Sequence, residues 1–362
     1  MPNHSQRRKA SKKRIAARVG VLVLSVLLIC VSGGFIYIHS LLNTIDRSEI
    51  TGVSSISASE MQEFMEPVSL SPGETVPDSV QDIKDTKAQY EAIQSVDKFH
   101  HKEIKNILLI GSDSRGTNDM GRSDSIMLMS INTSTQKIHL VSFMRTMYVN
   151  IPGKMWFALN TAYFFGGPDL LIETIENNFR VEIDDYMIIN FSSFESMIDL
   201  VGGIDIELTS AEAKYLNNLR GTNFNAGVNH LNGTLALDYA RIRKIDTDFH
   251  RTGRQRLVME ILLEQVLHSN VGTLNRFAQE MLPQINTSMS NSEILDYVLH
   301  VGEYTNYEID EMMLPIENQP DVAEENGGYQ GMMYVNYGGI AYEVWKVDYY
   351  TNVTALHERL IS

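Results

Sequence analysis

The sequence predicts an α/β fold with a central mixed β-sheet flanked by helices and preceded by one N-terminal transmembrane helix. Three observations predict it: apolar runs of strand length alternate with helical segments, turn residues separate them, and one long uncharged run lies near the N-terminus. Such alternation is typical of a sheet covered by helices. The 362 residues suit one large domain or two ordinary ones.

The uncharged run predicts the membrane helix. No Asp, Glu, Lys or Arg occurs between Arg18 and Asp46, and 20 mainly apolar residues run from Val19 to Ile38. Twenty helical residues rise about 30 Å, which matches the hydrocarbon core of a bilayer. A cleaved signal peptide is the alternative, but its apolar region would be shorter and would end at a small-residue cleavage site.

Charge is divided unevenly along the chain. Residues 1–18 carry seven Lys or Arg and no acid, so residues 19–362 hold 23 bases against 45 acids, a net charge of −22. The positive-inside rule predicts a cell-membrane protein with one span, a cytoplasmic N-terminus and an extracellular domain. With this net negative charge, residues 19–362 repel phosphate, which argues against a general nucleic-acid partner. The single cysteine, Cys30, excludes an intrachain disulfide framework and a zinc site built from several cysteines.

Four regions follow from these patterns: a cytoplasmic basic tail (1–18), the transmembrane helix (19–40), an extracellular stalk or linker (41–103) and a folded domain (104–362). The stalk contains Ser-rich pieces, a Pro/Gly turn and, over residues 78–96, one segment of helical composition. We expect it to be a flexible spacer, because it shows no other core-forming periodicity.

Within the folded domain, short apolar runs closed by turn residues predict strands at 107–110, 125–131, 137–143, 186–191, 204–208, 312–315 and 343–348. Helical periodicity predicts helices at 168–179, at 192–201, after Thr209, at 252–268 and at 354–361. Pro168 suits a first helical turn. Capping boxes are predicted at Ser192 with Glu195 and at Thr209 with Glu212.

Two aspartates lie where predicted strands end or begin. Asp113 follows the first strand, and Asp124 opens the second. Either alone is ordinary turn chemistry. Ligands gather beyond the carboxyl ends of strands in α/β sheets, and Mg²⁺ takes one or two carboxylates together with waters and phosphates. The pair is therefore compatible with a Mg²⁺ site.

Arginines are concentrated in residues 240–256. Six of the 23 bases that follow residue 18 lie there, and five of the six are arginine. The spacing groups Arg241 with Arg243 on one side of an extended segment, and Arg251, Arg254 and Gln255 on one helix face. A solvated helix with ion pairs to Asp246 and Asp248 is the alternative. Because arginine binds phosphate in a bidentate way, we favour a phosphate or pyrophosphate site.

Arg145 ends the third predicted strand and is either a solvated strand end or an anion-binding residue. The sequence contains no G-x-S-x-G elbow, no Walker A loop and no H-E-x-x-H motif. Without an evident protein nucleophile, direct displacement at phosphorus is the simplest mechanism.

Several stretches, in this order and behind an N-terminal anchor, resemble the LytR–CpsA–Psr (LCP) family of bacterial cell-wall enzymes. They are NILLIGSDSR, RSDSIMLMSIN, IHLVSFMRTMYVNIPG, LNTAYFFGG, FESMIDLVGGIDIEL, LNGTLALDYARIRK and DTDFHRTGRQR. The resemblance implies an extracellular phosphotransferase that moves an anionic glycopolymer, such as teichoic acid or capsule, from a polyprenyl-pyrophosphate carrier to peptidoglycan. A polyprenyl-pyrophosphate hydrolase and a non-catalytic, membrane-anchored regulator of envelope assembly remain alternatives.

The resemblance also assigns roles to residues. It implies that Mg²⁺ is held by Asp113 and Asp124, and that these act in catalysis with Arg145, Arg241 and Arg243. It implies a phosphate-binding set of Arg145, Arg241, Arg243, Asp248, Arg251, Arg254 and Gln255. It further implies a pocket beneath the sheet for the polyprenyl tail.

Three positions depart from the family pattern. Thr146 stands where an aspartate is common, Ala158 where a lysine is common, and His250 where a glycine is common. Lys154 is a candidate to replace the missing lysine. Because the other cationic residues are present, we expect activity with altered substrate contacts.

Overall fold

The computed structural model describes residues 34, 36–53, 55, 57, 61–62, 65–69, 75–76, 78–113, 123–318 and 331–362. The chain divides into two compact units, residues 1–45 and 46–362, and the folded domain lies in the second. None of the helices in these ranges combines the length and the hydrophobicity of a membrane span. The predicted basic tail, and most of the predicted membrane helix at 19–40, lie outside the described residues.

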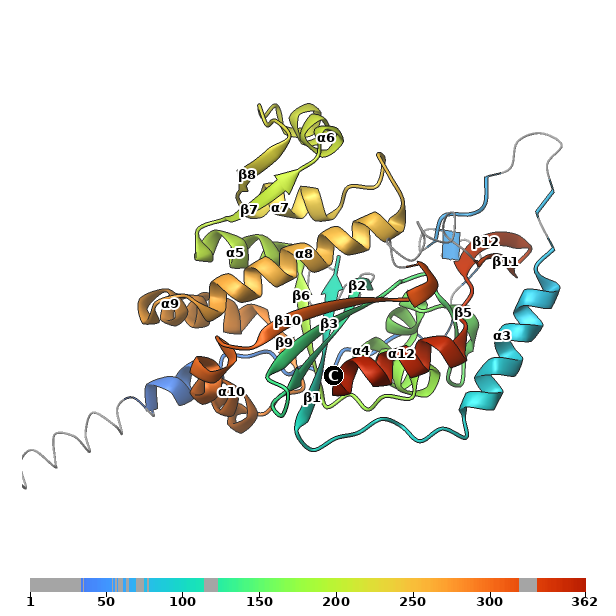
Figure 1. Ribbon diagram of the computed structural model, residues 1–362, viewed down its shortest axis with the longest axis horizontal. Coiled ribbons are helices and arrows are strands. Elements are labelled where there is room, and N and C mark those ends of the chain that lie inside the picture. Colours follow the sequence, from blue (N-terminus) through green and yellow to red (C-terminus); the bar gives the residue numbers. More distant parts are fainter. Residues whose placement is uncertain are drawn as a thin grey trace, which may run out of the picture. The chain divides into compact units, whose positions relative to one another are not determined.

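A six-stranded mixed sheet forms the centre of the domain, as predicted (Figure 1). Its order is β10-β3-β2-β1-β6-β9. The strands are β1 (Ile104–Ser112), β2 (Ser123–Asn132), β3 (Lys137–Phe143), β6 (Asp185–Asn190), β9 (Asn286–Thr287) and β10 (Glu308–Leu314). β2 is antiparallel to β1 and β3, which are parallel to β6 and β10 respectively. The carboxyl ends of β1, β3, β6 and β10 therefore share one edge of the sheet with the start of β2.

Helices cover both faces of this sheet. One face packs against α4 (Asn160–Phe179) and α12 (Tyr349–Ile361), and α3 (Val80–Ile93) lies against α12. The other face is covered by α5 (Phe191–Val201), α7 (Gly233–Ala240), α8 (Asp248–Leu267), α9 (Val271–Met281) and α10 (Asn291–Tyr304). Figure 1 shows the two helical layers on opposite sides of the strands.

The apolar strands explain this arrangement. Side chains alternate along a strand, so Leu108 and Ile110 enter the core under α4 and α12, whereas Ile107 and Leu109 enter the core under α8 and α10. A strand that is buried on both faces reads as a continuous apolar run. The run around residues 107–110 therefore predicted a strand of this kind correctly.

Three two-stranded sheets lie outside the central one. They are β4 (Tyr148–Ile151) with β5 (Met155–Ala158), β7 (Ile204–Leu208) with β8 (Gly227–Leu231), and β11 (Met332–Tyr337) with β12 (Ile340–Trp345). The antiparallel pair of β7 and β8, with α6 (Ser210–Arg220) in the connection between them, extends from α7 at one end of the domain (Figure 1). Of these strands, β7 was predicted at its observed position.

The helix predicted from Pro168 is the second half of a longer helix. α4 begins at Asn160, is interrupted at Gly166 and Gly167, and continues from Pro168. Gly167 has φ +65°, and a Cβ there would lie 2.2 Å from the carbonyl oxygen of Ile50. Only glycine tolerates both this conformation and this close approach, so the kink depends on it.

Side-chain caps begin α5 and α6. The predicted box of Thr209 and Glu212 is confirmed at α6. The predicted box of Ser192 and Glu195 is wrong, because Asn190 caps α5 and accepts from the backbone N–H three residues later at 2.9 Å. β6 runs directly into α5, so Asn190 is both the last strand residue and the N-cap.

Two further boundaries differ from the prediction. α8 begins at Asp248 rather than at Thr252, following Thr247 in extended conformation. The strand predicted at 343–348 lies earlier, as β12, because Asp348 caps α12 and cannot continue a strand. Asp348 caps α12 through its side chain, whereas Thr247 makes no side-chain hydrogen bond to the start of α8.

The expected flexible spacer is packed against the domain over much of its described length. Met61, Met65 and Ile93 are buried in the main core, and Pro67 bridges to Tyr342. The predicted helix within residues 78–96 is confirmed as α3. The described part of residues 46–103 therefore belongs to the same compact unit as the sheet, and the boundary expected at residue 103 does not separate two units.

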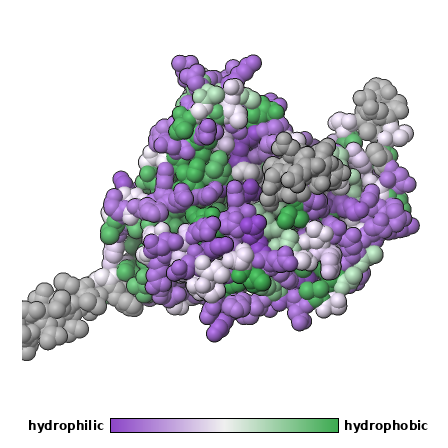
Figure 2. Space-filling model, viewed as in Figure 1, coloured by the Kyte–Doolittle hydropathy of each residue, from purple (hydrophilic) through white to green (hydrophobic). Residues whose placement is uncertain are grey.

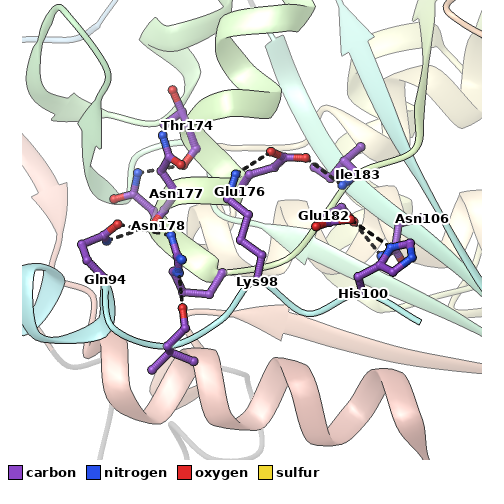
Figure 3. Close-up of polar contacts among 12 residues, drawn as sticks. Gln94, Lys98, His100, Asn106, Thr174, Glu176, Asn177, Asn178, Glu182 and Ile183 are labelled. Carbon is purple, nitrogen blue, oxygen red and sulfur yellow. Dashed lines mark hydrogen bonds and ion pairs between the residues drawn. The ribbon is translucent and has the colours of Figure 1, made fainter. Parts of the chain in front are cut away.

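Polar contacts hold the segment between α3 and β1 to the end of α4 (Figure 3). Lys98 pairs with Glu176 at 2.8 Å, and Glu176 also accepts from the backbone N–H of Ile183 at 2.9 Å. His100 lies 2.9 Å from a carboxylate oxygen of Glu182. These contacts fix the entry into β1, the strand that leads to Asp113.

Candidate functional site

Three of the predicted site residues lie at one edge of the central sheet. Asp113 follows β1, Asp124 is the second residue of β2, and Arg145 lies just beyond β3. The pairing of β1 with β2 shifts by one residue, from Gly111 opposite Ser125 to Ser112 opposite Ser123. The shift leaves Asp124 as the extra residue of a β-bulge, a feature that re-aims side chains at strand ends.

Arg145 connects two carboxylates at this edge. Its Nη1 donates to Asp124 at 2.8 Å, and its Nε donates to Asp248, the first residue of α8, at 3.3 Å. The side chain is 11% exposed. Burial by itself would lower the pKa of Arg145, but the charges of Asp248 and Asp124 outweigh it and raise that pKa. The guanidinium is therefore charged and held in one orientation.

Arg251 lies beside this pair, one turn along α8. Its Nη2 is 2.7 Å from Asp248 Oδ1, and its side chain is only 4% exposed. The approach is not aligned as a hydrogen bond, and within the described ranges Nε and Nη2 have no hydrogen-bond partner. The pKa of Arg251 is lowered to about 10, mainly by burial and also by the charges of Arg145 and Arg243, while Asp248 and Asp124 oppose the change. The positive charge here is incompletely compensated, as expected of a site that receives an anion.

An apolar pocket borders the same edge of the sheet. It has an empty volume of about 610 Å³ including the space at its mouth. Its lining includes Gly111 and Ser125, which adjoin the edge, and apolar side chains of β1, β2, α5, α7 and α8 such as Leu109, Met127, Phe194, Leu237 and Met259. Hydrophobic residues reach the surface around α7 and α8, where the rest of the face is mostly hydrophilic (Figure 2).

Arg241 and Gln255 supply polar groups to this pocket. Arg241 ends α7, and its guanidinium lies over the ring of Phe191, 4.4 Å from the centroid. Such stacking orients a guanidinium without neutralising it. Phe191 was predicted to end a strand, but it is the first residue of α5, which packs against α7. Its position directly before Ser192, the predicted N-cap, was the signal in the sequence that a helix begins there.

Arg243 and Asp113 lie at the rim of the site. Arg243 is 45% exposed and is 3.6 Å from Glu66. Ile242, between Arg241 and Arg243, is buried whereas both arginines are exposed, in agreement with the predicted alternation. Asp113 is partly buried and lies near Tyr163, whose pKa is raised to about 12 mainly by burial and slightly by the Asp113 charge.

Arg254 is not brought into this cluster. Its guanidinium is 5% exposed and pairs with Glu212 of α6 at 2.7 Å and with Asp246. The helical spacing that grouped it with Gln255 was correct, but the contacts of the two side chains differ. Glu212 was predicted only as a capping residue, so its pairing with Arg254 was missed.

The carboxylates at the sheet edge are chemically suited to a magnesium ion. Asp113 and Asp124 stand at the adjoining ends of β1 and β2, and both offer oxygen donors. Among the described residues, no group of three or more His, Cys, Asp or Glu side chains is arranged to hold a metal. Mg²⁺ needs only one or two protein carboxylates when phosphate oxygens and waters complete its shell, so this donor pair fits it.

The three departures from the family pattern lie around the site. Thr146 accepts a backbone hydrogen bond from Trp345 through its carbonyl, and Ala158 is completely buried in β5. Lys154 lies over the ring of Phe165, 5.4 Å from the centroid. His250 is exposed, and its Nδ1 is 3.0 Å from the hydroxyl of Thr247.

Comparison with known proteins agrees with the fold and the motifs. The LytR_cpsA_psr family model matches residues 74–342. Among curated relatives, the polyisoprenyl-teichoic acid–peptidoglycan teichoic acid transferase TagU of Oceanobacillus iheyensis is 38% identical over 175 residues, which cover 46% of this chain and 53% of the relative. TagU of Bacillus mycoides is 33% identical over 203 residues, 55% of this chain and 65% of the relative. The chain thus spans about half to two thirds of these relatives.

Solved structures share the fold. TagV of B. subtilis has a TM-score of 0.55 at 25% identity and covers 72% of this chain and 97% of its own. A YwtF (TagT) structure with bound octaprenyl pyrophosphate lipid has a TM-score of 0.52 at 20% identity and covers 74% and 93%. With the family model matched over most of the folded domain, this chain belongs to the LytR–CpsA–Psr family.

Proposed function

We propose that this protein is a membrane-anchored, extracellular phosphotransferase that moves an anionic glycopolymer from a polyprenyl-pyrophosphate carrier to peptidoglycan. Family membership, relatives named as teichoic acid transferases and a similarly folded protein with bound octaprenyl pyrophosphate support the proposal. The glycopolymer is of the teichoic acid or capsule type.

The observation that carries the proposal is the junction of the arginine cluster and the apolar pocket. Arg145 and Arg251 form a buried cationic centre, and Arg241 lies in the pocket wall nearby. An amphiphile with an anionic head and a hydrocarbon tail matches this junction, because its head needs fixed positive charge and its tail needs a dry pocket. A soluble nucleotide or sugar phosphate would leave the pocket empty.

The reaction is a displacement at phosphorus. A peptidoglycan hydroxyl oxygen bonds to the phosphorus that carries the glycopolymer, and the bond from that phosphorus to the bridging oxygen breaks. Polyprenyl phosphate leaves with the bonding electrons, and the hydroxyl proton passes to a carboxylate. Asp113 and Asp124 are the candidate proton acceptors, and the one whose oxygens are not fully committed to a metal ion would take this role.

The arginines stabilise the charge that develops during this displacement. Arg145 is fixed by two carboxylates, so its guanidinium requires no reorganisation when the phosphate oxygens gain charge. Arg251 has unused N–H groups that a phosphate oxygen would satisfy. Arg241 and Gln255 bind the head group from the pocket side, and Arg243 binds it from the rim. A Mg²⁺ ion held by Asp113 and Asp124 would supply further charge neutralisation at the pyrophosphate.

The proposal is tested by a transfer assay with the purified full chain, a polyprenyl-pyrophosphate-linked glycopolymer and a peptidoglycan acceptor. We expect polymer on peptidoglycan with the wild-type protein and a loss of at least roughly a hundredfold with Arg241→Ala. Unchanged transfer by the variant would contradict the site. Release of lipid phosphate at the same rate without acceptor would indicate a hydrolase, and no turnover at all would favour a regulator.

Two parts of the proposal have tests of their own. Binding of Mn²⁺ as a Mg²⁺ probe, followed by electron paramagnetic resonance, should weaken in Asp113→Asn even where no substrate is present. Protease digestion of intact cells should remove the folded domain if it lies outside the membrane. Protection of the domain in intact cells would contradict the proposed location.

A further inference from the structure

The guanidinium of Arg254 in α8 is buried between α6 and the loop that joins α7 to α8. Its Nε donates to Glu212 Oε1 of α6 at 2.7 Å, and its Nη1 donates to the carbonyl oxygen of Ile242 at 3.1 Å. Its Nη2 pairs with Asp246. All three sides of the guanidinium that carry donors are therefore occupied by groups of the protein itself, in contrast to Arg251.

Glu212 is held as tightly as its partner. Its Oε2 accepts from the backbone N–H and from the hydroxyl of Thr209, both at 2.9 Å, and this leaves Oε1 for Arg254. Burial by itself would raise the pKa of Glu212, but the hydrogen bonds from Arg254 and Thr209 outweigh it and lower that pKa. The ring of Tyr239 covers the guanidinium, 5.8 Å from its carbon. The pair is a buried, ionised contact between α8 and the start of α6.

The pair of Arg254 and Glu212 matters for the site because Arg254 also contacts the loop between α7 and α8. Ile242 lies between Arg241 and Arg243, and Asp246 precedes the first turn of α8. Residues 241–247 contain neither a helix nor a strand, so the loop lacks the backbone ladder that would otherwise fix its shape. The buried side chain of Ile242 and the guanidinium of Arg254 fix it instead.

We propose that Arg254 and Glu212 are positioning residues that hold Arg241 and Arg243 at the pyrophosphate, and that Arg254 does not bind phosphate itself. The inference rests on the proposed function, because it concerns the side chains that would contact the substrate there. It reassigns Arg254 from the phosphate-binding set that the sequence suggested, and it adds Glu212, which lies on a helix that contributes no other residue to the site.

The two roles of Arg254 make opposite predictions for Glu212→Gln. If Arg254 were a phosphate ligand, removing the charge of Glu212 would free it and leave pyrophosphate binding unchanged or stronger. If Arg254 positions the loop, Glu212→Gln and Arg254→Gln should both weaken the binding of inorganic pyrophosphate and reduce transfer by a similar factor, roughly ten- to a hundredfold. The double variant should lose no more than Arg254→Gln alone, because that single variant already removes the contact with Glu212.

A control ion pair also begins on α6. Arg220 of α6 pairs with Asp238 of α7, at 2.5 Å from its Nε and 3.0 Å from its Nη2. Neither side chain contacts the loop of residues 241–247 in the contacts that the structure describes. Arg220→Gln should therefore keep transfer and pyrophosphate binding at the wild-type level. In Glu212→Gln, kcat should fall together with the affinity for pyrophosphate. Arg254→Lys should retain more of both than Arg254→Gln does.

The deciding measurement is hydrogen exchange of the full chain, because it does not depend on activity. The backbone amides of residues 241–247 should exchange at least about tenfold faster in Glu212→Gln than in the wild type or in Arg220→Gln. Unchanged exchange in Glu212→Gln would overturn the positioning role, even if Arg254→Gln does not fold. Faster exchange without any transfer by the wild-type protein would retain the positioning role and reject the proposed function.

Discussion

Replacing Arg251 with methionine should stabilise the free protein while abolishing anion binding. The Arg251 guanidinium is 4% exposed and close to Asp248, yet its pKa is lowered from 12.5 to about 10, first of all by burial. A difference of that size corresponds to about 3 kcal/mol by which the protein environment disfavours the charged form, with the attraction of Asp248 already included. An apolar side chain of similar length avoids this cost, and Asp248 does not become an unpaired charge because it keeps Arg145 as a partner at 3.3 Å.

The expected gain in the free energy of unfolding for Arg251→Met is about 1–3 kcal/mol, since some packing will be imperfect. Urea denaturation of the full chain measures it, with Trp156 and Trp345 as fluorescent reporters; Trp345 packs against Phe249 at the start of α8. Inorganic pyrophosphate should stabilise the wild-type protein against urea but not the variant. A variant less stable than the wild type by 1 kcal/mol or more would refute the reasoning that this charge is incompletely compensated. Arg251→Lys, which keeps a charge, should not gain stability.

Three other outcomes follow from the structure. Phe191→Leu should weaken pyrophosphate binding about threefold through loss of the stacking under Arg241, and Phe191→Tyr should retain it; equal affinities in titration calorimetry would contradict that role. Gly233→Ala should lower the free energy of unfolding, measured by urea denaturation, by about 3 kcal/mol, because its Cβ would lie 2.1 Å from the carbonyl oxygen of Glu195 in α5. A loss below 1 kcal/mol would show that α5 and α7 can move apart. Burial lowers the pKa of His357 below its usual 6.5, so unfolding takes up a proton and the stability of the protein should fall as the pH drops below 6.5. His357→Gln should show a shallower fall in stability between pH 6.5 and 5, and parallel curves of stability against pH for the two proteins would contradict this.

The site could be predicted from the sequence only as a set of residues. Asp124, Arg145, Asp248 and Arg251 are joined by contacts between side chains up to 103 positions apart, and no periodicity contains that information. Residue type still indicated the chemistry, because arginine in an acidic chain points to an anion. Arg254 shows where this reasoning stops: its residue type and spacing match those of its neighbours, and only its surroundings distinguish it.

By itself, the sequence determined the α/β class, the mixed central sheet, several helices and one capping box, since alternation, apolar runs and caps are local properties of the chain. It did not determine that the described part of residues 46–103 packs on the domain, because that segment has little internal periodicity and is ordered by contacts such as Met61 in the core and Lys98 with Glu176. Only the tertiary structure decided which arginines lie at the sheet edge or the pocket and which one is enclosed by acidic partners, because these surroundings are formed by segments far apart in the sequence.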